Sequence, residues 1–123
     1  MCGSQLSGCS SGREVPIAVE SGYAGPQVRL DSSQPNYAVV FSSPSAGWVA
    51  AVDRVVESHK RKDIFVTLRK PDPRFIYTQQ IVEQRLLTSV ASAEPTRLCV
   101  RVLDYDADPD SREYPIAAVS PGK

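Results

Sequence analysis

The stretch Asp63-Ile64-Phe65-Val66-Thr67-Leu68-Arg69 decides the fold class of this chain. Ile64, Val66 and Leu68 occupy every second position, and mostly polar residues occupy the positions between them. Because successive side chains of a β-strand point to opposite faces of a sheet, this alternation predicts a strand with one buried face. It is the clearest strand pattern in the sequence.

The same period of two recurs before this stretch. Tyr37, Val39 and Phe41 share one side of a predicted strand, and a second run extends from Trp48 to Glu57. Pro44-Ser45-Ala46-Gly47 separates the two runs, and both proline and glycine suit a turn because proline fixes its own φ and glycine accepts a positive one. The polar segment Ser58-His59-Lys60-Arg61-Lys62 then predicts a hairpin loop.

Residues 75–90 fit two patterns. Tyr77, Ile81 and Leu87 have helical spacing, whereas Val82, Leu86, Thr88 and Val90 fit the alternation of a strand. Isoleucine, valine, threonine and tyrosine favour strands, so we expect one or two strands here, after a break at Pro71-Asp72-Pro73.

Many short strands separated by turns predict an all-β fold, either a small antiparallel β-sandwich, with an immunoglobulin-like arrangement as one option, or a partly open barrel. Val15–Val19 and Gln27–Leu30 are predicted to be short edge strands, and Leu98–Val102 a core-facing one. The predicted organisation is a flexible tether over residues 1–14, one β-domain over residues 15–103, and an acidic, proline-rich irregular tail over residues 104–123. Within the tail, Tyr114–Val119 could dock back as an edge.

Composition restricts the class of function. The chain has 123 residues, enough for one domain, with 14 basic and 14 acidic residues and no formal net charge. This balance argues against a nucleic-acid binder with a strong electric field. No apolar run approaches the ~18 residues that a membrane span needs, so contact with a membrane would require an attached lipid.

Leu6-Ser7-Gly8-Cys9 resembles a lipobox, in which an aliphatic residue and two small residues precede the cysteine that accepts lipid. Only five residues precede it, whereas a signal peptide needs a basic region and an apolar run of roughly 7–15 residues. Either Met1 is an internal start and Cys9 is lipidated, or the tetrapeptide occurs by chance in a Ser/Gly-rich terminus. The first hypothesis, which we favour, places the protein on the periplasmic side or surface of a bacterial envelope, and the second in the cytoplasm.

The sequence offers little for catalysis. Its single histidine, His59, lies in a basic loop, and no Gly-x-Ser-x-Gly, His-Glu-x-x-His or Cys-x-x-Cys motif is present. The alternating carboxylates of Asp104–Asp110 could converge on calcium, but Pro109 and Pro115 stand where an EF-hand needs glycine and glutamate. We therefore expect no enzyme, metal or cofactor.

Two surfaces are candidates for binding. Lys60, Arg61 and Arg69 with Phe65 could bind single-stranded nucleic acid on a small barrel, as a less favoured alternative. The favoured site is the turn Pro44-Ser45-Ala46-Gly47-Trp48, whose exposed tip would meet a partner above Trp48. The competing interpretation is a tight turn in which Trp48 only fills the core.

The segment from Tyr37 to Leu103 resembles the C-terminal domain of bacterial protease-complex-stabilising lipoproteins. This resemblance implies a non-enzymatic envelope protein that binds or stabilises a partner protein, with a protease as the expected partner. The turn also resembles the first binding loop of chagasin-type inhibitors of cysteine proteases, which implies protease inhibition as an alternative function. The features that carry the first resemblance are Val39-Val40-Phe41, Pro44 to Trp48, Val49 to Val56, Ile64 to Leu68, Pro71 and Pro73, Thr78-Gln79, and Leu98 to Val102.

Overall fold

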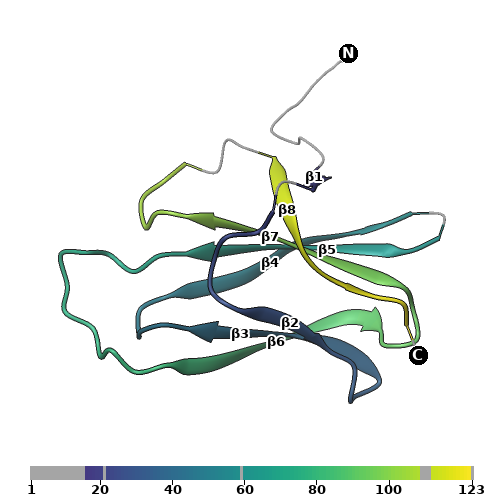
Figure 1. Cartoon of the computed structure of the whole chain (residues 1–123), viewed down its shortest axis with the longest axis horizontal. Coiled ribbons are helices and arrows are strands. Elements are labelled where there is room, and N and C mark those ends of the chain that lie inside the picture. Colours follow the sequence, from purple (N-terminus) through teal and green to yellow (C-terminus); the bar gives the residue numbers. More distant parts are fainter. Residues whose placement is uncertain (1–15, 21, 59, 109–111, 123) are drawn as a thin grey trace, which may run out of the picture.

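In the computed structural model, two β-sheets pack face to face (Figure 1). The structure describes residues 16–20, 22–58, 60–108 and 112–122. Cys9, the predicted tether over residues 1–14, and His59 lie outside the described residues. The strands are β1 (Ile17–Val19), β2 (Val28–Asp31), β3 (Asn36–Ser43), β4 (Val49–Glu57), β5 (Lys62–Arg69), β6 (Val82–Ala91), β7 (Thr96–Leu103) and β8 (Glu113–Ser120).

The larger sheet has the strand order β1-β8-β7-β5-β4, and the smaller one has the order β2-β3-β6. Both sheets are open and do not close into a barrel, so the predicted all-β fold takes the form of a small β-sandwich. Most neighbouring strands are antiparallel, but β1 is parallel to β8, and β5 is parallel to β7. The direction of β5 and β7 follows from the connection, because the chain leaves β5, crosses to the smaller sheet for β6, and returns as β7 (Figure 1).

The core confirms the alternation that predicted the fold. Ile64, Val66 and Leu68 of β5 are completely buried between the sheets. They pack with inward-facing residues of the other strands, and burying each such side chain contributes about 1.5–3 kcal/mol. The remaining fully buried members of this cluster are Tyr37, Val39, Phe41, Val90, Leu98 and Val100.

Strand β3 is more buried than its alternation suggests. Ala38 and Val40, on the outer face of the smaller sheet, are as buried as the core-facing residues beside them. Val40 lies between Arg29 of β2 and Arg85 of β6 in the register. Long arginine stems can cover apolar surface while their charged ends stay in water, which accounts for the burial of Val40.

The predicted local connections are mostly confirmed. The amide of Ser58 donates to the carbonyl of Arg61 over 2.9 Å, closing the hairpin between β4 and β5. The segments Ile17–Val19 and Val28–Asp31 are edge strands as predicted. Residues 75–90 contain strand β6 and no helix, and residues 70–81 form the loop that precedes it.

The prediction of an irregular tail over residues 104–123 is wrong for its second half, which forms strand β8. Strand β8 lies inside the larger sheet, between β1 and β7, and not at its edge. The Asp/Pro-rich composition gives no sign of this strand. Its stability comes from pairing with residues that are distant in the sequence. The ladder with β7 ends at Cys99 and Ile116, next to Pro115, which has no N–H group to continue it.

Candidate functional site

Three loops gather at one end of the sandwich, on the left in Figure 1. They are the turn of residues 44–48 between β3 and β4, the loop of residues 70–81 between β5 and β6, and the loop of residues 104–108 after β7. We call this region the loop end. Direct contacts join the first loop to the second and the second to the third.

Gly47 joins the first loop to the second. Its φ is +94°, in the left-handed region that favours glycine. An ideal β-carbon placed on Gly47 would lie 2.5 Å from Cε1 of Tyr77 and 2.8 Å from Cβ of Pro71. Next to it, the amide of Ala46 donates to the carbonyl of Thr78 over 3.1 Å. The sequence needs glycine here both for the turn and for the close approach of the second loop.

Trp48 supports the turn from below. Its ring meets Phe41 edge-to-face, with ring centroids 5.8 Å apart, and is partly buried against the core. Above it, Pro44 and Gly47 are exposed while Ser45 is buried. The exposed part of the predicted turn is therefore small, and the second loop enlarges the surface around it.

The second loop carries exposed apolar side chains at its apex. Phe75 is 63% exposed and Ile76 is 100% exposed. On one side of the apex, Asp72 accepts hydrogen bonds from the Arg74 amide and guanidinium, which lower the pKa of the Asp72 carboxyl. On the other side, Tyr77 packs over Gly47. A turn within the loop therefore fixes one side of the apex, and contact with the turn of residues 44–48 fixes the other.

The acidic third loop closes around an arginine. The Arg69 guanidinium donates to the carbonyl oxygens of Asp104 and Ala107 over 3.0 and 2.8 Å. Both contacts are made by backbone oxygens, so they hold the loop against the end of β5. Across the described residues, no group of three or more His, Cys, Asp or Glu side chains is arranged to hold a metal ion.

Further contacts tie the third loop to the second. The Arg74 guanidinium carbon lies 5.7 Å from the centre of the Tyr105 ring, and the Lys70 amine lies 3.6 Å from the Asp104 carboxylate. A hollow of about 310 Å³ separates the two loops. It is lined by Lys70, Pro71, Pro73, Asp104, Tyr105 and Asp106.

The predicted nucleic-acid surface is not assembled. Phe65, the base-stacking residue of that less favoured alternative, is only 1% exposed and packs edge-to-face on Tyr114. Lys60 and Arg61 lie in the hairpin before β5, whereas Arg69 lies at the opposite end of that strand. Phe65 shares its face with polar residues, but Cys99 of β7 and Tyr114 of β8 pack against it and bury it.

A polar network on that outer face was not predicted. The hydroxyls of Thr67 and Tyr114 both donate to the Asp53 carboxylate, the latter over 2.9 Å. Arg101 donates to the Thr67 hydroxyl over 2.8 Å, and its guanidinium lies over the Tyr114 ring. The signal in the sequence is one polar side chain on each of four strands, but only the register brings them together.

Arg97 and Asp63 form a second outer-face contact, with two hydrogen bonds of 2.9 Å each. The hydrogen bonds that Arg97 donates to the Asp63 carboxylate raise the pKa of Arg97. Between these polar groups, Cys99 is completely buried, and burial raises the pKa of its thiol from 9.0 to about 11. The Cys99 thiol therefore stays protonated at neutral pH, which suits packing and not nucleophilic attack.

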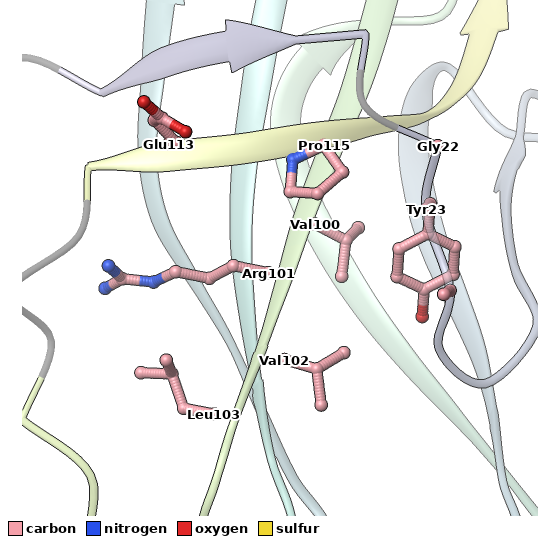
Figure 2. Close-up of a pocket in the computed structure, with 9 residues that line it drawn as sticks. Gly22, Tyr23, Val100, Arg101, Val102, Leu103, Glu113 and Pro115 are labelled. Atoms are coloured by element: carbon pink, nitrogen blue, oxygen red, sulfur yellow. The ribbon is translucent and has the colours of Figure 1, made fainter.

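A cleft of about 340 Å³ opens where β8 leaves β7 (Figure 2). Val100 and Val102 point toward the side where Tyr23 lies, whereas the Arg101 and Leu103 side chains point the opposite way. The Tyr23 hydroxyl donates to the carbonyl of Pro26, and burial raises the pKa of Tyr23 to about 12. The walls are mostly apolar, and this cleft lies apart from the loop end.

No family model matches this chain, and neither a curated protein nor a solved structure matches it. In the described part of the chain, no helix has the length and hydropathy to cross a membrane.

Proposed function

We propose that this protein is a non-enzymatic binding domain that docks a partner protein through its loop end. The observation that carries the proposal is the apex of the second loop, where Phe75 and Ile76 project exposed while Asp72 and Tyr77 hold the backbone on both sides. Large apolar groups fixed on a rigid support are typical centres of protein interfaces. A loop that is already ordered loses less conformational entropy on binding.

The charges at the loop end support a protein partner over an anionic membrane. Arg74 is paired with Asp72, and Lys70 lies beside Asp104, so these cations are balanced by neighbouring carboxylates. An anionic lipid surface attracts clusters of unbalanced basic residues. A protein with an apolar recess for Ile76 fits this balanced surface better.

The arrangement of reactive groups supports a role without chemistry. The one described cysteine is buried with a raised thiol pKa. The hydroxyls of Ser43, Ser45 and Ser92 donate to backbone carbonyls. Within the described residues these are structural contacts, so binding is the better proposal.

The partner and the cellular address are proposed from the sequence. Leu6-Ser7-Gly8-Cys9 supports lipid attachment at Cys9 and a place on the bacterial envelope. The resemblance to protease-complex-stabilising lipoproteins supports a protease as the partner. The turn of residues 44–48 and the second loop would form the contact surface.

The experiment compares three versions of the full chain produced in its own cells and crosslinked before gentle extraction. The Ile76→Asp variant removes the exposed apolar apex, and Val119→Asp makes the same change at an exposed residue of β8, away from the loop end. We expect the unmodified chain and Val119→Asp to retain one defined partner that Ile76→Asp loses. If all three retain the same proteins, or none retains a defined partner, the proposal fails.

Protease inhibition is the second candidate, and the convergence of three loops at one end favours it. Such a row of loops can enter an active-site cleft as a wedge. The test is to titrate purified protein against papain-like proteases, with Ile76→Asp as the matched variant. Inhibition that the variant loses would support this function, and no inhibition at high micromolar concentration would end it.

A further inference from the structure

Strand β6 has one side without a partner strand. Its other side pairs with β3, in a regular ladder that runs from Val82 opposite Ser43 to Leu87 opposite Ala38. In the described part of the chain, β6 is an edge of the smaller sheet. A regular, unpaired edge is a template for another extended strand.

The sequence of this edge is nearly symmetric about its centre. Gln84 lies at the centre, with acidic Glu83 before it and basic Arg85 after it, and two apolar residues flank this group on each side: Ile81-Val82 and Leu86-Leu87. When a second copy runs antiparallel with Gln84 opposite Gln84, residues whose numbers are equally far from 84 face each other. Glu83 of each copy then lies opposite Arg85 of the other.

We propose that two copies of this chain associate through β6 in this register, making one continuous six-stranded sheet. Opposite charges placed directly across neighbouring strands stabilise an antiparallel pair. The symmetric contact contains two Glu83–Arg85 pairs on the outer face of the sheet. On the inner face, Val82 of each copy lies opposite Leu86 of the other.

The exposed apolar residues at this edge find partners in the same register. Ile81 is 75% exposed and Leu87 is 76% exposed. Ile81 of each copy would lie opposite Leu87 of the other, so each side chain covers part of the other's exposed surface. Sheet extension therefore covers apolar surface that the isolated chain leaves open.

Charge selects this register over its neighbours. A shift by two residues in one direction places Arg85 opposite Arg85, and the same shift in the other direction places Glu83 opposite Glu83. Like charges directly opposite destabilise a strand pair. Within one chain, Glu83 already lies 3.7 Å from Arg29, and Arg85 is bonded to Asp31, so the new pairs extend a row of alternating charge across the sheet.

The other long edge strand is less suitable. In β4 the register shifts between Val52 and Arg54, which marks a bulge at Asp53. A bulge twists an edge away from a partner strand, and charged residues there oppose pairing. Strand β1, with three residues, and β2, with four, are short.

The test is the mass of the full chain in reducing buffer, measured by sedimentation velocity over a wide range of protein concentration. We expect twice the monomer mass for the unmodified chain. Glu83→Arg and Arg85→Glu each place like charges opposite one another at two positions. Each should therefore raise the dissociation constant of the dimer by roughly tenfold or more. Arg54→Glu on the bulged edge of β4 is the matched charge control and should remain dimeric.

Mixing the two variants keeps the proposal testable even where one charge change perturbs the chain. The Glu83→Arg chain carries two positive charges at positions 83 and 85, and the Arg85→Glu chain carries two negative charges there. Both cross-strand contacts of a mixed pair therefore join opposite charges, so the mixture should regain the double mass that neither variant shows alone.

A monomeric unmodified chain overturns the proposal. A dimer that Glu83→Arg and Arg85→Glu leave unchanged, or that Arg54→Glu dissociates, overturns it as well.

Discussion

The ring of Tyr77 lies against Gly47 so closely that the second loop and the turn share one packed contact. A β-carbon at Gly47 would lie 2.5 Å from Cε1 of Tyr77, well inside ordinary van der Waals separation. The two residues are thirty positions apart in the sequence. Their contact fixes the apolar apex of the second loop relative to the sandwich.

Gly47→Ala should destabilise the domain by about 2–4 kcal/mol, because a positive φ and a steric clash act together. Gly22→Ala is the matched control, since Gly22 has a φ of +72° but nothing within 4 Å of its added β-carbon. We expect this control to cost about 1 kcal/mol. Urea unfolding of both variants measures the difference, and equal losses would show that Tyr77 leaves room for a side chain.

Phe65→Ala should cost about 3–5 kcal/mol of unfolding free energy, because it removes a buried aromatic ring. Phe75→Ala, which truncates an exposed ring, should change stability by less than about 0.5 kcal/mol. Chemical denaturation of the two variants makes the comparison. A small effect of Phe65→Ala would mean that the outer face of the larger sheet is open to ligands.

The fold was predictable where a strand carries its own pattern. The alternation of Ile64, Val66 and Leu68 reflects burial between two sheets, and burial acts on each residue of β5 directly. Strand β8 carries no comparable pattern, and two neighbouring strands stabilise it. Its existence depends on pairing that composition cannot reveal.

The candidate site was predictable only in part. Gly47 stands out in the sequence because glycine close to a proline suits a turn, but the sequence does not show that Tyr77 covers it. The exposure of Ile76 depends on how the second loop crosses between sheets, and the burial of Phe65 depends on Tyr114 from a distant strand. Both are properties of topology and not of local residue preference.

The outer-face network makes a prediction about coupling. Asp53→Ala leaves the buried Tyr114 hydroxyl without its acceptor, so we expect a loss of about 1–3 kcal/mol. Tyr114→Phe removes the same hydrogen bond from the other side. A double-mutant cycle should therefore show a coupling of about 1 kcal/mol, and additive losses would mean that the two groups do not depend on each other.

Burial of Cys99 predicts a decrease of stability at high pH. The folded state raises the thiol pKa from 9.0 to about 11, so between these values the unfolded state loses its proton first. The stability that the protonated Cys99 thiol contributes is fully present below pH 9 and is lost as the pH rises toward 11. Urea unfolding across this range should show a smaller decrease for Cys99→Ala than for the unmodified chain, and identical decreases would exclude Cys99 as a source.

The same burial predicts slow chemistry at neutral pH. In a chain whose Cys2 and Cys9 are replaced by serine, Cys99 should react with a thiol reagent only at the rate of unfolding. The measurement is reagent uptake in native buffer and in urea. Fast reaction in native buffer would contradict the packing of Cys99 with Phe65 and Tyr114.

Site-specific photocrosslinking in living cells tests the central claim most directly. A photoreactive amino acid is placed at Ile76 in the loop end or, as the control, at Val119 on β8. The account predicts one defined protein adduct from position 76, absent from position 119 and absent when Phe75→Asp is added. Adducts that are the same at both positions, or no protein adduct at position 76, would contradict the claim that this domain acts by binding a partner at its loop end.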